Sequence, residues 1–470
     1  MATTPSPTRS LTDHQKRMTL ITCVLASSLA FIDSSVINVG LPAIVRAMQG
    51  DHQSLQWLIG GYLLPLSALL LLGGALGDRY GRRLILMLGA FVFALASVAC
   101  GAAPNLSVLL VARFVQGVGA ALLVPNSLAI LGDTFQGEAR GRATGIWAAA
   151  GAATGAGGPI FGGWLIDTLS WRMIFLINVP LASVAIFLAW RYVRENDCVD
   201  GLAAIRQPLD GLGAWLATVA LGAMTWGLIL ATGPEGLTPA GSTGVCLGAG
   251  LLVVFIYWER HKGATAMMPL VMFGSPTFSS LTALTLLLYG ALGCLMVLLP
   301  YVLIVASGYS STEAGAALLP LPLIIAVTSP WMGGLAGRYG VRRFLLAGPC
   351  IVAAGFAWMA RIGLQADYWP EVFPALAVIA LGLALAVSPL TTAVLSSVHP
   401  RQTGAASGLN NAIARTGGLM ATAMLGQVLA LQGLALITAF HWAVMLCALV
   451  CIGAGACALF VDKACGARKP

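Results

Sequence analysis

The sequence predicts an all-α polytopic membrane protein with fourteen transmembrane helices. Two observations carry this prediction: 58% of the 470 residues are hydrophobic, and only 9% are charged. Soluble domains usually carry about 25% charged residues, so a water-soluble fold is excluded. Because a helix needs roughly 20 apolar residues to cross a bilayer, the chain has room for many spans and for no large domain outside the membrane.

The predicted spans come from cutting the chain at its charged, glycine, proline and polar breaks. They lie at 20–44, 55–76, 84–102, 106–131, 142–166, 173–193, 209–231, 243–258, 278–305, 312–336, 343–363, 371–395, 403–430 and 438–461. The fifth segment is so rich in glycine that its hydropathy is weak, and the eighth is the shortest. An even number of spans places both termini on one side of the membrane.

The first segment follows a basic tail and could be mistaken for a secretion signal. It is longer than the apolar part of a signal, it carries Asp33 and Asn38, and it lacks a small-x-small exit. We therefore predict that it is retained as the first span of the protein.

The basic residues indicate how the chain is oriented. Most of the 25 lysine and arginine residues fall in the tails and in the loops on the side of the termini, whereas Arg46, Arg172 and Arg361 fall on the other side. Under the positive-inside rule, both termini are cytoplasmic. The basic residues recur in twos and threes rather than in one patch, so the net charge of +8 does not indicate nucleic-acid binding.

An internal repeat predicts the architecture. The sequence LGDRYGRR at 76–83 follows the second segment and recurs after the tenth as LAGRYGVRR at 335–343. At nearly the same offset, residues 142–145 at the start of the fifth segment resemble residues 405–408 at the start of the thirteenth. Spans 1–6 therefore correspond to spans 9–14 in the same orientation, as in transporters built from parallel repeats.

Spans 7 and 8 remain as an inserted two-helix hairpin between two parallel six-helix pseudo-repeats. The predicted regions are an N-terminal cytoplasmic tail at 1–19, a six-helix bundle at 20–193, a linker with the inserted helices at 194–262, a second six-helix bundle at 263–461 and a C-terminal tail at 462–470.

Asp33 is the strongest candidate for chemistry, because it is the only acidic residue well inside a predicted span. An intramembrane carboxyl is costly and usually functional. Burial favours its neutral form, and a cation or water nearby favours its ionised form. Such a group can take up a proton on one side and release it on the other, and a cationic substrate can compete for the ionised form. The alternative is a neutral acid hydrogen-bonded between helices.

Two further polar residues lie within the fourth span. Arg113 is always charged, so it either biases the protonation of an embedded carboxyl or binds backbone carbonyls of a neighbouring span. Gln116 lies three residues on and shares its helix face. At the start of the tenth predicted span, Glu313 follows three hydroxyl residues and is predicted to be a helix N-terminal charge rather than a coupling acid.

Metal, cofactor and enzyme chemistry find no support in the sequence. The ten cysteines show no CxxC pair, and the chain contains no HExxH, Walker A or GxSxG motif and no pair of intramembrane carboxylates. We therefore expect no metal site, no cofactor and no direct use of ATP. A membrane-embedded lipid-modifying enzyme is the alternative from a different functional class.

Several motifs resemble those of the major facilitator superfamily and, within it, the fourteen-span drug:proton antiporters. The resemblance is carried by the loop GDRYGRR at 77–83, IDSSVINVGLP at 32–42, RFVQGVG at 113–119, the glycines and proline of the fifth span, WR at 171–172 and NVP at 178–180. It implies a proton-coupled exporter of lipophilic or cationic compounds that works by alternating access. It also implies a bacterial inner-membrane location, and we expect a monomer that needs only protons, a substrate and the bilayer.

The resemblance also implies roles for particular residues. Asp33 and Arg113 would couple protons to transport. A gating loop would comprise Gly77, Asp78, Arg79, Gly81, Arg82 and Arg83, with Asp78 pairing with an arginine or a helix N-terminus. The antiporter motif would comprise Gly145, Gly158, Pro159, Gly162 and Gly163 and would allow close helix packing. Two positions depart from the pattern, because Thr154 replaces a glycine of that motif and Gly337 stands in the second repeat where the first has Asp78.

The expected substrate cavity is built from polar and aromatic side chains in the spans. The candidates are Asn38, Tyr62, Gln116, Asn126, Trp147, Tyr289, Asn410 and Arg415. The aromatic residues are alternatively core or interfacial side chains, and Arg415 alternatively extends towards the cytoplasmic interface. A transporter of one specific metabolite or of a self-produced natural product is the second transport hypothesis.

Overall fold

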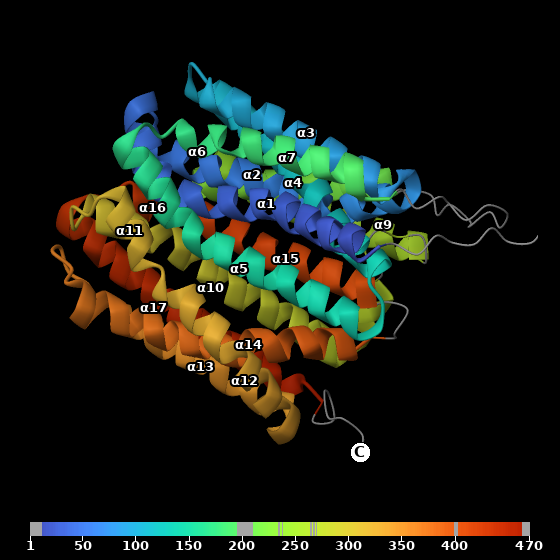
Figure 1. Cartoon of the computed structure of the whole chain (residues 1–470). Coiled ribbons are helices and arrows are strands. Elements are labelled where there is room, and N and C mark those ends of the chain that lie inside the picture. The colour runs from blue at the N-terminus through green and yellow to red at the C-terminus, as the bar shows by residue number, and fades with distance from the viewer. Residues whose placement is uncertain are drawn as a thin grey trace, which may run out of the picture.

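The protein is an elongated bundle of long helices lying side by side (Figure 1). The computed structural model describes residues 12–194, 210–233, 236, 238–263, 266, 268, 270–398 and 403–462. Most of the predicted linker after residue 194, the first residues of the N-terminal tail and nearly all of the C-terminal tail lie outside the described residues. The first helix begins at Asp13, within the region predicted as the N-terminal tail.

We call α1 to α7 the first half and α10 to α17 the second half, with α8 and α9 between them. Figure 1 shows α1–α4 and α7 together in the upper part of the view and α12–α14 and α17 in the lower part. The first half contains α1 (Asp13–Met48), α2 (His52–Tyr80), α3 (Arg82–Gly101), α4 (Leu106–Thr134), α5 (Gly137–Thr168), α6 (Met173–Leu176) and α7 (Asn178–Tyr192).

The middle pair is α8 (Gly211–Ala231) and α9 (Pro239–Lys262). The second half contains α10 (Pro276–Val305), α11 (Ser311–Ala317), α12 (Pro320–Tyr339), α13 (Val341–Met359), α14 (Phe373–Ser396), α15 (Thr403–Ala423), α16 (Gly426–Leu429) and α17 (Gly433–Cys457). A π-helical turn, Tyr368–Val372, leads into α14.

Twelve helical stretches in the described parts of the chain are long and apolar enough to cross a membrane. The protein is therefore a multi-pass membrane protein, and twelve is the number of spans that length and hydropathy support. Two further helices have 32 and 21 residues, α5 and α15, and do not reach the same hydropathy. Both are rich in glycine and polar residues, which is the physical reason why apolar character alone does not identify them.

Local sequence signals begin the helices. Thr12 and Gln15 form a capping box at the start of α1, and Asp51 accepts a hydrogen bond from the amide of Ser54 at 3.0 Å at the start of α2. Such caps satisfy amide groups that have no partner within the helix. Glu313 forms a capping box with Ser310 at the start of α11, which confirms its predicted role as a helix N-terminal charge.

The helices α8 and α9 pack closely against each other. A Cβ atom at Gly227 or Gly244 would overlap the backbone of the other helix, so these glycines permit the contact. Asp210 caps α8 and accepts a hydrogen bond from the indole of Trp258 in α9 at 2.9 Å. The pKa of the Asp210 carboxyl lies below its usual value. Burial alone would raise this pKa, but the hydrogen bonds that the carboxylate accepts lower it by more.

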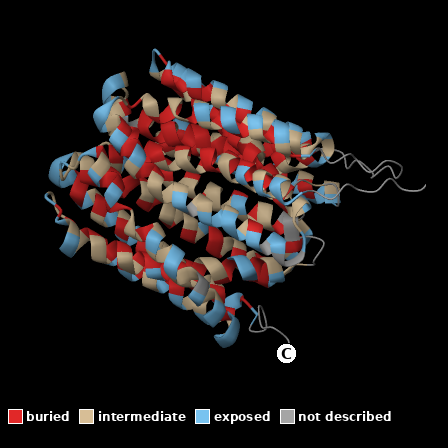
Figure 2. Cartoon of the chain, viewed as in Figure 1, coloured by how far each residue is buried: buried red, intermediate tan, exposed pale blue. Residues whose placement is uncertain are grey.

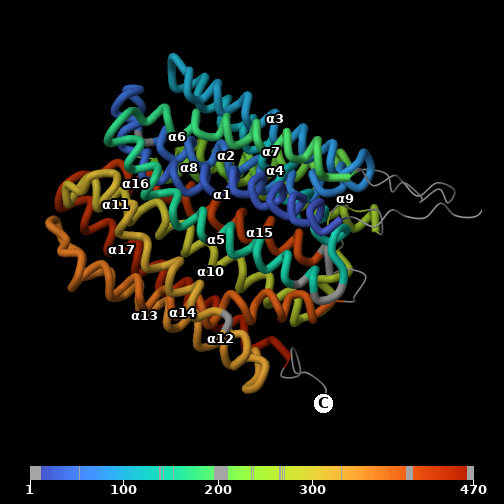
Figure 3. Tube along the Cα trace, in the orientation of Figure 1, coloured from blue at the N-terminus to red at the C-terminus, as the bar shows by residue number. Residues whose placement is uncertain are grey.

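The two ends of the bundle differ in charge. At one end, which we call the basic end, α2 passes into α3 through Asp78–Arg83, and α12 passes into α13 through Arg338–Arg343. The other end, which we call the far end, contains the connections from α1 to α2 and from α10 to α11. The buried residues concentrate inside the bundle (Figure 2), and the tube in Figure 3 shows α1, α5, α10 and α15 near its centre.

Candidate functional site

Asp33 lies near the middle of the 36-residue helix α1 and is only 3% exposed. Its carboxylate accepts a hydrogen bond from Arg113 Nη1 of α4 through Oδ2 at 2.5 Å. The two groups form a buried ion pair, with the Arg113 side chain 0% exposed. The structure therefore brings together the two residues that the sequence singled out as an intramembrane acid and an intramembrane cation.

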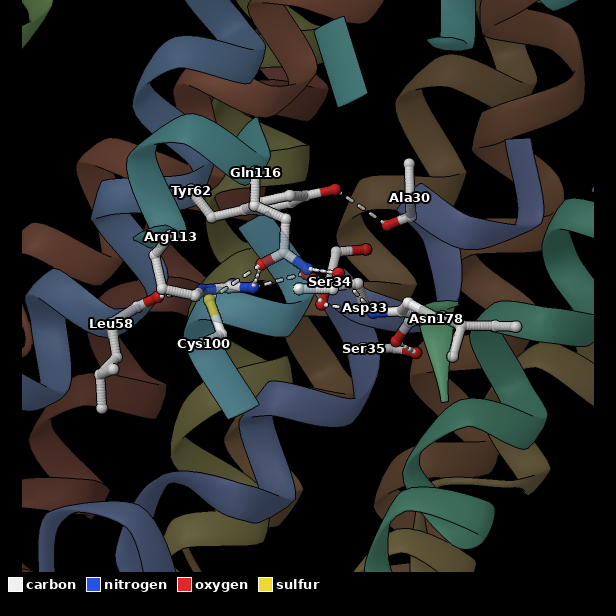
Figure 4. A network of polar contacts seen from close by, with 12 residues as sticks. Ala30, Asp33, Ser34, Ser35, Leu58, Tyr62, Cys100, Arg113, Gln116 and Asn178 are labelled. Carbon is white, nitrogen blue, oxygen red and sulfur yellow. Dashed lines mark hydrogen bonds and ion pairs between the residues drawn. The ribbon is translucent and has the colours of Figure 1, made fainter. Parts of the chain in front are cut away.

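Two amide side chains complete the surroundings of the carboxylate (Figure 4). Gln116 Nε2 donates to Asp33 Oδ1 at 2.8 Å, and Asn178 Nδ2 at the start of α7 donates to the same oxygen at 3.2 Å. The hydroxyl of Ser97 in α3 accepts from Gln116 Nε2 at 2.9 Å. Donors from α4 and α7 thus converge on one carboxylate of α1.

Arg113 is held by more than its ion pair. Its Nε donates to the carbonyl of Leu58 at 3.1 Å, and its guanidinium lies 4.5 Å from the ring centroid of Tyr62. Its Nη1 also donates to Gln116 Oε1 at 2.8 Å. Arg113 therefore makes both kinds of contact that the sequence suggested, since it pairs with the carboxyl and also binds a backbone carbonyl of α2.

The ion pair is sealed from solvent in this conformation. A cationic substrate has no access to a carboxylate that is 3% exposed and already paired with an arginine. Direct competition at Asp33, as the sequence suggested, is therefore not available in this arrangement. Any coupling to substrate has to act through the residues around the pair. All partners of Asp33 described above belong to the first half.

Sequence reasoning did not select Ser97 or Asn178 as site residues. Asn178 belongs to the NVP motif at 178–180, which was a usable signal, because an amide at the start of an apolar helix has to find a partner. Ser97 is one of many small polar residues in the spans, and nothing in its neighbourhood along the chain distinguishes it.

Several expected cavity residues lie inside the packed first half. Gln116 and Asn126 are both 0% exposed, Tyr62 is 1% exposed and Asn38 is 7% exposed. Asn126 donates to the carbonyls of Gly73 and Leu122, both at 2.8 Å, and so joins α4 to α2. In this conformation these side chains are out of reach of a substrate.

The other expected cavity residues are half-buried, namely Trp147, Tyr289, Asn410 and Arg415. Trp147 donates to the hydroxyl of Ser27 at 2.8 Å and stands edge-on to Phe31, with 5.8 Å between ring centroids. Asn410 accepts from Thr285 Oγ1 at 2.8 Å, which joins α15 to α10. Arg415 lies near the middle of α15, which favours the interior position over an extension to the interface.

The loop at the basic end joins helices of the first half. Arg82 binds Asp78 through Nη2 at 2.7 Å and Asp133 at the end of α4 through Nη1 at 2.5 Å. Arg83 donates to the carbonyl of Trp190 in α7 at 2.9 Å. The glycine between the two helices, Gly81, has a φ of 102°, which an L-residue rarely adopts. Asp78 therefore pairs with an arginine, as expected, and that arginine lies in its own half.

The glycines of α5 form a seam. A Cβ atom at Gly158 or Gly162 would overlap side chains of α1, and one at Gly163 would overlap the backbone of Ser311 in α11. A Cβ atom at Gly315 of α11 would in turn overlap the backbone of Pro159. These positions let α5 contact α1 and the second half at the same time, whereas Gly145 lies in open space.

Hydrogen bonds also join the halves, and they lie at the far end. Asp167, near the end of α5, accepts from the amide and the hydroxyl of Thr312 at 2.8 and 2.6 Å. Gln56 of α2 donates to the carbonyl of Ala423 at the end of α15 at 2.8 Å. Together with the glycine contacts of α5, these bonds hold the two halves against each other at the far end.

We expect Asp167→Ala to weaken this closure. Hydrogen bonds to a charged but exposed carboxylate contribute about 1 kcal/mol, which is roughly a fivefold change in an equilibrium. The reporter is Ser34→Cys in a cysteine-free background, labelled with a membrane-impermeant thiol reagent added from the far end. Labelling should be faster in the protein that also carries Asp167→Ala than in the protein that keeps Asp167. Asp167→Asn keeps an acceptor oxygen and should have a smaller effect. Equal labelling rates in all three proteins would show that Asp167 does not hold the halves together.

The sequence is similar to proteins of known families. It matches the family described as Major Facilitator Superfamily over residues 23–284 and 281–469. It is 32% identical to multidrug resistance protein Stp of Mycobacterium tuberculosis over 88% of this chain and 76% of that protein. It is 31% identical to methylenomycin A resistance protein of Bacillus subtilis over 88% of this chain and 87% of that protein.

The fold is similar to that of solved transporters. A bacterial homolog of the human lysosomal transporter Spinster, in an inward-facing and unoccupied conformation, superimposes with a TM-score of 0.67. The comparison covers 98% of this chain and 100% of that one at 18% sequence identity. At that identity the comparison supports the fold alone.

Proposed function

Because the chain belongs to the Major Facilitator Superfamily, we propose that it is a proton-coupled antiporter that exports toxic small molecules such as drugs. Relatives that cover most of the chain are named for resistance to drugs or to an antibiotic, which supports export. The observation that carries the proposal of proton coupling is the buried ion pair of Asp33 and Arg113, at 2.5 Å.

We propose that the membrane is crossed fourteen times, as in the fourteen-span branch of the superfamily. The helices α5 and α15 would be the two additional spans. They have lengths suited to crossing, and both take part in the contacts between the halves. The two bundles at 20–193 and 263–461 would rock against each other, with α8 and α9 as the inserted pair. The basic end would face the cytoplasm of a bacterium, across its inner membrane.

Proton coupling in this scheme requires a change within the first half. All described partners of Asp33 belong to that half, so rocking of two rigid halves would leave the ion pair intact. Protonation of Asp33 would remove its negative charge and weaken its hold on Arg113. Because α1 carries Asp33 and also packs against α10 and α11 of the second half, a shift of α1 can transmit this change across the interface.

The conformation described above fits one state of this cycle. The far end is held closed by α5, α11, α2 and α15, and Asp33 is paired with Arg113. In the proposed cycle this would be the state that has released its proton and receives substrate from the basic end. The energy would come from the proton gradient alone, and the transporter would act as a monomer on a lipophilic compound.

Inside-out membrane vesicles test the proposal. Energised vesicles containing the protein should lose part of their internal acidity when a transported compound is added, because protons leave as the compound enters. Vesicles without the protein give the baseline for a panel of lipophilic cations, anions and neutral drugs. A response to several compounds supports a multidrug exporter, and a response to one compound supports a dedicated exporter. A folded, inserted protein that responds to none would reject proton-coupled drug export.

A further inference from the structure

Arg415 lies on the face of α15 that is turned towards the first half. Gly408 and Leu419 share its stripe of α15, at helical spacings of seven and four residues. Gly408 faces Leu71 of α2, and Leu419 faces Gly60 of the same helix. The opposite side of α15 packs on α10 through Gly417. The guanidinium therefore points to the interface between the halves, midway along the bundle, where transporters of this architecture place their substrates.

Aromatic side chains from three helices lie in the neighbourhood of this guanidinium. It lies 6.0 Å from the ring centroid of Phe31 in α1. Tyr62 of α2 and Tyr289 of α10 are the ionisable side chains close enough to interact with it. Phe31, Tyr289 and Arg415 are all half-buried. The positive charge of Arg415 thus lies near the rings of Phe31 and Tyr289, and neither ring is fully covered by protein.

The charge on Arg415 is not balanced by an acid. Among the described residues, none of the ion pairs and hydrogen bonds involves its guanidinium. Arg113 differs in both respects, because it is 0% exposed and is neutralised by Asp33 at 2.5 Å. Among the described residues near the middle of the bundle, one positive charge thus remains unpaired, at Arg415. An arginine at this depth requires water or a counter-charge, and such residues commonly mark a substrate pathway.

We propose that Arg415 binds the acidic group of an amphipathic organic anion, whose apolar body lies against the rings of Phe31 and Tyr289. This proposal rests on the proposed export function and names its substrate class. The planar guanidinium suits carboxylate or sulfonate groups, with which it forms paired hydrogen bonds. A cationic compound would be repelled by the same charge, so the cationic part of the sequence-based expectation is replaced by an anionic one.

The position of Arg415 also suggests how substrate binding could influence the protonation of Asp33. Tyr62 lies within electrostatic range of Arg415, and its ring packs 4.5 Å from the guanidinium of Arg113. Its hydroxyl donates to the carbonyl of Ala30 in α1 at 3.2 Å. A ligand that draws Arg415 away from Tyr62 would change the surroundings of Arg113, and through it those of Asp33. Substrate would then influence the protonation of Asp33 without touching it.

Equilibrium binding to the purified full-length protein tests the proposal, with three probes that share one ring system. Naphthoate is anionic, naphthamide is neutral and naphthylmethylammonium is cationic. We expect the wild type to bind naphthoate about tenfold more tightly than either other probe. Arg415→Gln should weaken naphthoate binding by about ten- to a hundredfold and leave naphthamide unchanged, because a charge-assisted hydrogen bond is lost. Arg415→Lys should retain part of the preference.

Control measurements separate the loss of the charge at Arg415 from loss of charge elsewhere, from misfolding and from failure of the proposed antiport. Arg338→Gln removes the same charge from the exposed basic end and should bind all three probes like the wild type. Unchanged naphthamide binding shows that Arg415→Gln is folded. The proposal is overturned if the wild type prefers the cation, binds no naphthoate, or keeps its naphthoate affinity in Arg415→Gln. Intact anion binding without proton movement in vesicles would instead reject only the proposed antiport.

Discussion

Asp33→Asn is expected to abolish substrate-driven proton movement while substrate binding persists. Asparagine has nearly the same shape as aspartate and can still accept the hydrogen bond of Arg113 through its carbonyl oxygen. It can neither bind nor release the proton that the cycle requires. Because no other acid lies well inside a span, no neighbouring group can take over. We expect the loss of internal acidity in energised vesicles to fall to the level of vesicles without the protein.

Asp33→Glu is the matched control for this variant. It keeps a carboxyl at nearly the same place and should retain measurable proton movement. Binding of substrate to Asp33→Asn in detergent shows that the protein is folded. If Asp33→Asn vesicles respond to substrate as strongly as the wild type, Asp33 does not carry the coupled proton.

Arg113→Met is expected to have the largest effect on stability. It leaves the Asp33 carboxylate buried without its cation, and removing one partner of a buried pair costs about 3–5 kcal/mol. Unfolding of the purified protein in mixed micelles measures this cost.

The double variant Asp33→Asn with Arg113→Met isolates the interaction between the two residues. Removing both charges leaves neither group unpaired, so the double variant should be more stable than Arg113→Met alone. If the two single effects simply add, the ion pair is not an energetic unit, and its role in coupling loses its physical basis.

The sequence predicted the helices well because crossing a bilayer requires long apolar runs. It was less informative for α5 and α15, where glycines replace apolar side chains. Those glycines are used for contact, as at Gly163 against the backbone of Ser311. Hydropathy measures transfer into lipid and carries no term for close packing between helices.

The residues of the candidate site could be predicted only in part from the sequence. A charged residue inside a span is rare enough to stand out, so Asp33 and Arg113 could be selected before their pairing was known. Uncharged partners such as Ser97 and Asn178 could not be ranked, because their roles depend on which helices meet. The burial of Tyr62 and Asn126 also depends on packing, and so does the far-end contact of Asp167.

The central claim is that substrate binding and the protonation of Asp33 are linked. Purified protein in weakly buffered detergent solution tests this directly, with a pH-sensitive dye that records protons as a transported compound is added. Our account predicts proton release from the wild type in proportion to the compound bound, and binding without release from Asp33→Asn. Equal proton release from both proteins, or binding to the wild type without release at any pH tested, would contradict it.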